Sequence, residues 1–254
     1  FNEWMMKATD LDTLNHISLP SIADKFLIKE GCYKGVMQMG GIVREFIQRC
    51  IVGGRTMCRD NIAWDILGME DPIESKTLLS EKEWREKQTI YEDYILNDFD
   101  GVSLYPSAMH RMPGFLKGSP KVIKVLDYEH LKQYDGFFVE VRITRVGKNR
   151  HFPLMSTIEN GVRQFSNDTD GKTYYIDKTS YEDLITFQDC DIEIIRGYYF
   201  DEGRNSQIND TMLDLFELRL AAKKKENPIQ AVYKELMNSA YGKTIMKPID
   251  TNTK

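Results

Sequence analysis

Several kinds of segment are missing from the sequence, and each absence narrows the class of protein. No apolar run approaches the roughly 20 residues that a transmembrane helix requires, so we expect no membrane span and no membrane partner. The first residues, Phe1-Asn2-Glu3-Trp4, lack the basic stretch and apolar core of a signal peptide, so we expect an intracellular rather than a secreted protein. With 41% apolar and 29% charged residues, the composition is that of an ordinary globular protein.

Cysteine is scarce and poorly spaced for either metal binding or cross-linking. The four cysteines form no Cys-x-x-Cys pair and have no neighbouring histidine, and they are Cys32, Cys50, Cys58 and Cys190. This pattern argues against a zinc knuckle and against a disulfide framework. We expect free thiols in a reducing compartment, and none of the four scattered histidines as a metal ligand.

The charge of the chain is unevenly distributed. The net charge of -5 would argue against a nucleic-acid partner, but a phosphate backbone responds to local charge. Residues 219–247 contain seven basic and two acidic side chains, a local charge of +5, which leaves -10 for the remainder. A solvated helix face would show the same asymmetry, so the pattern alone does not establish a function.

Apolar spacing predicts helices near both ends of the sequence. Residues 11–30 follow a helical spacing that is broken at Pro20, and residues 80–94 form a charged helix. Near the other end, one face of an amphipathic helix is marked by Ile208, Met212, Leu215, Leu218 and Ala222. Asn227 then caps a further helix with Pro228 at its first position.

Residues 112–209 have the alternating pattern and turn residues of strands. Residues 137–143 alternate between apolar and polar positions, as a half-buried strand should, and residues 191–195 form another strand. Residues 165–176 are interpreted as a hairpin with its turn at residues 167–171.

The glycine pair Gly53-Gly54, followed by Arg55, predicts a turn upstream of these strands. Glycines would let the backbone approach a phosphate or DNA strand closely, with the arginine beside it. A plain tight turn would have the same sequence.

A candidate metal and nucleotide site lies in residues 100–107, Asp-Gly-Val-Ser-Leu-Tyr-Pro-Ser, after a strand predicted over residues 94–100. Asp100 can hold a divalent cation whose other ligands are phosphate oxygens, and Gly101 leaves its carbonyl free to join them. The following turn offers backbone N–H groups to a triphosphate. Tyr105 can lie beneath a sugar and exclude a 2′-hydroxyl group. Taken alone, the segment is equally well a strand-turn-helix with a core tyrosine.

A second candidate lies on the last predicted helix. Offsets of four and seven place Lys234, Asn238 and Tyr241 on one helix face, with Gly242 beside them. The lysine offers a positive charge to a pyrophosphate group, the tyrosine can stack on a base or sugar, and the glycine leaves space for a base pair. An amphipathic helix with a solvated lysine is the simpler interpretation of this helix alone. On the preceding helix, Arg219 and Lys223 are spaced to point at the same phosphates.

Together these segments resemble motifs A and B of family B DNA polymerases. Asp-x-x-Ser-Leu-Tyr-Pro-Ser at residues 100–107 precedes Lys-x-x-x-Asn-Ser-x-Tyr-Gly at residues 234–242, as in that family. The glycine pair is similar to the family's Tyr-x-Gly-Gly motif, although Ile51 stands at the tyrosine position. The 134-residue spacing between Asp100 and Lys234 looks like the protein-primed branch of bacteriophages, adenoviruses, linear plasmids and mobile elements.

The resemblance implies template-directed addition of dNTPs to a primer 3′-hydroxyl or a priming protein, with two Mg²⁺ or Mn²⁺ ions. Asp100 and Lys234 would be catalytic, with Asp100 and Gly101 at the metal. The implied nucleotide-binding residues are Ser103, Leu104, Tyr105, Lys234, Asn238, Tyr241 and Gly242. The implied phosphate or DNA contacts are Gly53, Gly54, Arg55, Arg219, Lys223 and Lys243. The implied partners are template-primer DNA, a dNTP and a terminal priming protein.

The fold class expected from the resemblance is α+β: a polymerase palm of antiparallel sheet and helices, a strand-rich insertion and a short two-helix fingers subdomain. The expected order begins with the tail of an exonuclease domain or entry to the palm at 1–40, followed by palm with motif A at 41–111. The insertion, which helps to hold the priming protein in that branch, occupies 112–209. Fingers with motif B occupy 210–247, and 248–254 return toward the palm.

Two departures from the family pattern affect the expected activity. The family's motif C, Tyr-x-Asp-Thr-Asp-Ser, does not occur after motif B. The segment Asp168-Thr169-Asp170-Gly171 is similar to part of motif C, but it precedes motif B and is interpreted as a turn with exposed carboxylates. No proofreading exonuclease motif occurs upstream. We therefore expect a fragment, or half of a split enzyme, that does not extend a primer by itself and needs the remaining part of a polymerase.

The sequence also bears on two other functions. A non-catalytic DNA-binding or scaffolding relic of a polymerase palm would be expected to lose Asp100, Tyr105 or Lys234, yet all three are present. An unrelated metal-dependent phosphotransferase would require a P-loop or kinase-like glycine motif, which neither Gly40-Gly41 nor Gly53-Gly54 fits.

Overall fold

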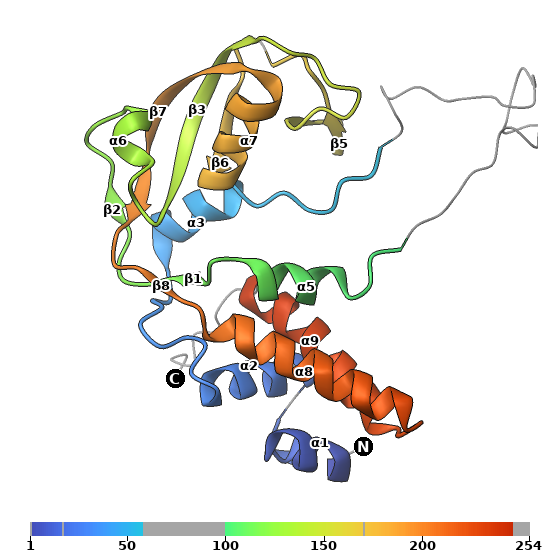
Figure 1. The fold of residues 1–254 in the computed structure, drawn as a ribbon. Coiled ribbons are helices and arrows are strands. Elements are labelled where there is room, and N and C mark those ends of the chain that lie inside the picture. The colour runs from blue at the N-terminus through green and yellow to red at the C-terminus, as the bar shows by residue number, and fades with distance from the viewer. Residues whose placement is uncertain (1, 17, 58–99, 170, 246–254) are drawn as a thin grey trace, which may run out of the picture.

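The computed structural model of the chain describes residues 2–16, 18–57, 100–169 and 171–245 (Figure 1). These residues form two packed parts, which we call the helical part and the sheet part. Figure 1 shows the helical part lying below the sheet part, with a short two-stranded ladder between them. The predicted helix at 80–94 and strand at 94–99 lie outside the described residues.

The helical part consists of five α-helices around one core. They are α1 (Asn2–Thr9), α2 (Leu19–Lys29), α5 (Leu104–Arg111), α8 (Gln207–Lys224) and α9 (Ile229–Ile245), with a short 3-10 helix at Thr13–Asn15. Their facing side chains are fully or almost fully buried, among them Met5, Leu27, Met109, Met212, Leu236 and Met237. The predicted helices near the C-terminal end are confirmed as α8 and α9, and Asn227 accepts a hydrogen bond from the backbone N–H of Ile229.

The prediction for residues 11–30 is wrong in its first half. Proline does not break a helix here, because Pro20 lies in the first turn of α2, where its missing N–H group has no partner to lose. Residues 11–16 contain only the 3-10 helix, and Leu14 is 84% exposed. The apolar spacing before Pro20 therefore marked no buried helix face.

The sheet part is built on a four-stranded antiparallel sheet in the order β2-β7-β3-β6. The strands are β2 (Lys121–Val122), β3 (Gly136–Val146), β6 (Thr173–Asp177) and β7 (Cys190–Phe200), and the adjoining helices are α6 (Tyr128–Leu131) and α7 (Lys178–Gln188). In β3 the predicted alternation is confirmed, because its apolar positions are buried in the core: Phe137, Val139, Val141 and Ile143. Helix α3 (Gly41–Arg49) packs on this sheet through Phe46, whose ring lies edge-on to Tyr175 and Tyr198.

The predicted hairpin over residues 165–176 is wrong. Strand β5 (Val162–Phe165) pairs with β4 (Ser156–Glu159), whereas β6 pairs with β3, so residues 166–172 connect two different sheets. The hairpin turn lies earlier in the chain, at Asn160-Gly161, where φ is 52° and 79°. Positive φ at both central residues is what a two-residue hairpin turn requires, and Asn-Gly is its strongest sequence signal.

Two short strands, β1 (Phe115–Leu116) and β8 (Arg204–Asn205), join the two parts. The Asn205 amide donates hydrogen bonds to the carbonyls of Gly31 and Lys34, which ties this ladder to the segment after α2. A Cβ at Gly114, where φ is +105°, would lie 2.4 Å from the Asn205 carbonyl oxygen, so glycine is needed for this approach. The ladder therefore fixes where the chain leaves the helical part and where it returns.

The combination of packed helices with antiparallel strands confirms the α+β class. The four-stranded sheet lies within residues 121–200, inside the range expected for the strand-rich insertion. None of the helices in the described part of the chain is long and apolar enough to cross a membrane.

Candidate nucleotide and DNA site

The segment at residues 100–107 forms a strained turn that leads into α5. Ser103, which precedes α5, has φ 47° and ψ 53°, the left-handed conformation, which costs a non-glycine residue about 1–2 kcal/mol. The Ser107 hydroxyl lies 2.8 Å from the Ser103 carbonyl and 3.2 Å from that of Val102, and the Ser107 N–H also donates to Ser103. These contacts hold the turn from its backbone side.

Helix α5 is fastened to α8 at both of its ends. At the N-terminal end, Arg219 Nη1 donates a hydrogen bond of 2.9 Å to Ser103 Oγ. At the other end, the side-chain amide nitrogen of Asn209 donates to the backbone carbonyls of Met109, His110 and Met112. The turn is therefore positioned by a helix that is distant in sequence, since 116 residues separate Ser103 from Arg219.

The two motif segments meet through their tyrosines. The rings of Tyr105 and Tyr241 stack with their centroids 4.2 Å apart and an interplanar angle of 16°. Tyr105 remains 48% exposed, whereas Tyr241 packs partly against the helical core. An exposed pair of stacked rings between two helices is a surface on which a planar base or a sugar can lie.

The predicted face of α9 is present. Lys234 and Asn238 are exposed and form no hydrogen bond or ion pair with the residues that the structure describes, and the same holds for Lys223 on α8. A Cβ at Gly242 would meet no atom within 4 Å, so this position leaves open space beside Tyr241. For Lys243 only the helical backbone is described.

Asp100 is exposed and precedes α5 by four residues. A Cβ at Gly101 would lie 3.3 Å from Leu104 Cδ1, so glycine relieves crowding beside this carboxylate. Leu104, the first residue of α5, is itself exposed. Within the described ranges, no group of three His, Cys, Asp or Glu side chains is arranged to hold a metal ion. Asp100 can therefore supply one carboxylate ligand to a divalent metal ion such as Mg²⁺, which prefers carboxylate and phosphate oxygens. The other ligands would have to come from elsewhere.

The Gly53-Gly54 segment is extended and exposed, so the predicted tight turn is wrong. It runs between the site and the sheet part. A Cβ at Gly54 would lie 3.9 Å from the Tyr105 hydroxyl. On its other side, Arg55 donates to the Phe152 carbonyl and lies over the ring of Phe165. The segment thus links the stacked tyrosines to the sheet part.

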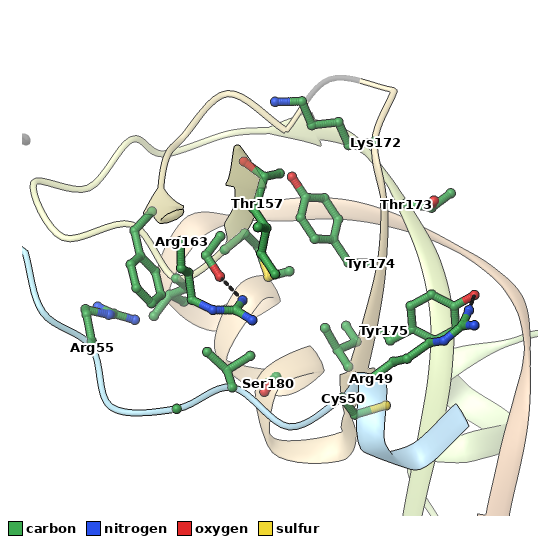
Figure 2. A pocket seen from close by; sticks show the side chains of 18 of the residues that line it. Arg49, Cys50, Arg55, Thr157, Arg163, Lys172, Thr173, Tyr174, Tyr175 and Ser180 are labelled. Carbon is green, nitrogen blue, oxygen red and sulfur yellow. Dashed lines mark hydrogen bonds between the residues drawn. The ribbon is translucent and has the colours of Figure 1, made fainter. Parts of the chain in front are cut away.

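A cavity of about 770 Å³ lies between this segment and the sheet part (Figure 2). Its walls come from the end of α3 and the following residues, the β4–β5 hairpin, β6 and α7. Four cationic side chains line it: Arg49, Arg55, Arg163 and Lys172. Asp183 is the acid among its lining residues.

The cations of the cavity are held by neutral groups. Arg49 donates to the Tyr175 hydroxyl at 3.0 Å, and Arg163 donates to Ser156 Oγ at 2.8 Å, as Figure 2 shows. Neither these two nor Arg55 and Lys172 form an ion pair with a carboxylate in the described part of the chain. The cavity therefore has an excess of positive charge.

The titratable groups of the cavity wall are shifted toward their neutral forms. Burial raises the pKa of Tyr174 to about 12 and that of the Cys50 thiol to about 12. Burial, and then repulsion by Asp177, also raises the pKa of Asp183. Tyr174 and Cys50 are therefore uncharged at neutral pH, which leaves the four cations and Asp183 to determine the electrostatic character of the wall.

Arg49, Arg163 and Lys172 were not predicted as site residues. They belong to three separate segments, and none stands in a motif. The Asn160-Gly161 turn was the one available signal, because it places Arg163 on a hairpin rather than in a loop.

Comparison with solved structures gives the fold. Phi29 DNA polymerase complexed with primer-template DNA matches with a TM-score of 0.57 and 16% identity, over 92% of this chain and 36% of that one. Its ternary complex with primer-template DNA and incoming nucleotides matches with a TM-score of 0.55 and 16% identity, over 94% and 37%. The complex with single-stranded DNA matches with a TM-score of 0.56 and 18% identity, over 96% and 38%. The chain thus spans little more than a third of the length of these polymerases.

Comparison at the level of sequence gives the family. No match was found among curated proteins. The family model described as DNA polymerase type B, organellar and viral, matches residues 78–254, which is more than half of the chain and includes both motif segments. The chain therefore belongs to the organellar and viral family of type B DNA polymerases, as motifs A and B predicted.

Proposed function

We propose that this chain forms the nucleotide-binding part of a DNA-directed DNA polymerase that adds dNTPs to a primer 3′-hydroxyl group or to a priming protein. The observation that carries the proposal is the meeting of the two motif segments, in which Tyr105 stacks on Tyr241. Membership of the family and the likeness to phi29 DNA polymerase support it, since those structures hold primer-template DNA and, in one case, nucleotides.

In this proposal, α8 and α9 form the fingers, within residues 210–247, and the sheet part is the insertion, within residues 112–209. The palm is represented by residues 41–111 and the entry to it by residues 1–40, with 248–254 returning to the palm. The remainder of the active site comes from another part of the polymerase, because the described residues offer one carboxylate at the metal.

The nucleotide would bind beside the stacked tyrosines. Asp100 and the carbonyl of Gly101 would hold a Mg²⁺ or Mn²⁺ ion, which when bound neutralises phosphate charge and activates the attacking oxygen. Lys234 is free to bind the phosphates of the leaving group, and backbone N–H groups near Ser103 and Leu104 add hydrogen bonds to them. Asn238 and the open space at Gly242 would accommodate the new base pair.

The tyrosine pair also offers a means of selecting the sugar of the incoming nucleotide. A base that enters between the motif segments must take the place of one ring against the other, because rings 4.2 Å apart leave no room for a third. Tyr105 would then lie against the sugar, where its bulk excludes a 2′-hydroxyl group. We propose that this ring selects deoxyribonucleotides.

The DNA would pass along the cationic cavity. Gly53 and Gly54 allow a strand to approach the backbone, and Arg55 lies at the cavity wall. We add Arg49, Arg163 and Lys172 to the DNA contacts, because guanidinium and ammonium groups without carboxylate partners are suited to phosphates. Lys223 and Lys243 are proposed as further phosphate or DNA contacts, and the sheet part as the surface that meets a priming protein.

The test is Asp100→Asn in the full-length protein that carries the chain. We expect primer extension to fall by at least about 10³-fold, because an amide cannot replace a carboxylate at a divalent metal. Circular dichroism and DNA affinity should stay unchanged, since Asp100 is exposed and supports no described contact. Primer extension at the level of the unaltered protein would reject the proposal, and unchanged DNA binding in a protein that never extends primers would favour a scaffolding relic.

A further inference from the structure

Arg219 differs from the other cations proposed to meet the nucleotide. Lys223, one turn further along α8, and Lys234 on α9 are exposed, whereas Arg219 is partly buried. Its guanidinium is aimed at Ser103, with Nη1 donating to the hydroxyl oxygen at 2.9 Å. No carboxylate in the described residues pairs with it.

The direction of this hydrogen bond determines what the serine can do. A guanidinium can only donate, so the Ser103 oxygen accepts and its own proton remains available. Such a hydroxyl, polarised by a cation, is a stronger donor to a further acceptor than an isolated one. The best acceptor at this place is an anionic oxygen.

The backbone of Ser103 determines where its side chain begins. The residue is in the left-handed conformation, and its carbonyl accepts from both the N–H and the hydroxyl of Ser107. The side chain thus departs from a fixed point at the start of α5, and Arg219 fixes its other end.

We propose that Arg219 is a positioning residue that acts on the triphosphate through Ser103: it orients the serine hydroxyl so that the O–H group donates to a phosphate oxygen. This inference rests on the proposed function of the site. It replaces the direct phosphate contact expected of Arg219 from sequence, and it adds the side chain of Ser103 to the groups that bind the nucleotide.

A double-mutant cycle in the full-length protein separates the two roles. Ser103→Ala and Arg219→Met should each raise the KM for dATP about tenfold, the loss of one charge-assisted hydrogen bond, with little change in kcat. If Arg219 acts through Ser103, the double variant should also show about a tenfold rise, because the second change removes nothing further. A rise of about a hundredfold would mean that Arg219 binds phosphate independently and would overturn the proposal.

Lys223→Met is the matched control on the same helix. Because Lys223 has no contact with Ser103, its effect on the KM should multiply with that of Ser103→Ala. Arg219→Lys, which keeps a cationic donor, should recover most of the affinity lost in Arg219→Met. A lysine variant no better than the methionine variant would count against hydrogen-bond donation as the cause.

A second measurement needs no catalysis. In the nucleotide-free chain of 254 residues, the losses in thermal midpoint caused by Ser103→Ala and Arg219→Met should not add, because both remove the same hydrogen bond. Additive losses would show that the contact is absent in solution and would reject the positioning role whatever the activity. Conversely, primer extension that survives Asp100→Asn would reject the polymerase site while leaving this coupling measurable.

Discussion

The helical part and the sheet part differ in how their cations are neutralised. On the sheet part, three arginines are paired across neighbouring strands or turns: Arg142 with Glu193, Arg145 with Asp189 and Asp191, and Arg196 with Glu140. In the helical part, the described ion pair is between Lys29 and Asp10, outside the motif segments. On the motif helices, the described side chains of Arg219, Lys223 and Lys234 form no ion pair with a carboxylate in the described residues.

This difference separates structural charges from those available to a ligand. Exposed ion pairs contribute little to stability, typically about 0–1 kcal/mol, but they do occupy the charges that form them. Cations without carboxylate partners occur on α8 and α9 and again around the cavity, where the sheet part faces the Gly53-Gly54 segment. Both places are therefore suited to phosphate groups, whereas the paired charges on the sheet are already occupied by one another.

The largest effect that would sharpen this comparison is expected in the helical part, at Tyr105. Replacement of Tyr105 by valine removes the ring that we propose lies against the sugar, while leaving the helix intact. Ribonucleotide incorporation relative to deoxyribonucleotide incorporation should rise roughly 10- to 100-fold, the range for one steric contact in a pocket. Tyr105→Phe, which keeps the ring, should discriminate as the natural residue does. Equal discrimination by the valine variant would assign this exposed tyrosine to packing only.

A smaller effect is expected where the sheet part faces the cavity. Arg163→Glu or Lys172→Glu should weaken primer-template DNA binding about tenfold at moderate salt and reduce the salt dependence, because a phosphate contact becomes a repulsion. Lys148→Glu makes the same change of charge on an exposed side chain outside the cavity, and fluorescence anisotropy should show DNA affinity close to that of the unaltered protein. Equal losses of DNA affinity in all three variants would show that the cavity residues act only through the overall charge of the protein and not through direct phosphate contacts.

The smallest effect concerns the acid of the cavity wall. Because burial raises the pKa of Asp183 in the folded state, the folded protein binds this proton more tightly than the unfolded chain. Its contribution to the free energy of unfolding is full below the ordinary aspartate pKa and is lost as pH rises through the raised value. The free energy of unfolding, measured with urea at several pH values, should therefore decline less steeply with rising pH in Asp183→Asn than in the unaltered protein. If the free energy of unfolding depended on pH in the same way in both proteins, the raised pKa of Asp183 would be contradicted.

Local patterns were sufficient where one segment determines its own conformation. Strand β3 follows from its alternation, and α9 begins after Asn227 because an amide cap followed by proline favours a helix start. The hairpin prediction failed because turn-forming residues at 167–171 also suit a connection between two sheets. Pro20 was assigned as a helix breaker although the same residue is compatible with a first helical turn.

The site shows the same limit. Residues 100–107 and 234–242 were recognisable because metal, phosphate and base each require particular residue types at fixed spacing. Arg163 and Lys172 could not be recognised, because an isolated cation on a strand or loop carries no spacing signal.

By itself, the sequence determined the family, the order of its two motifs and the residue types that can meet a nucleotide. Only the tertiary structure decided that Tyr105 stacks on Tyr241, that Arg219 reaches Ser103 across 116 residues, and that separated cations share one cavity. The physical reason is that side-chain periodicity and backbone preference act over a few residues, whereas such contacts exist only after the cores of both parts have packed and fixed the distances between their surfaces.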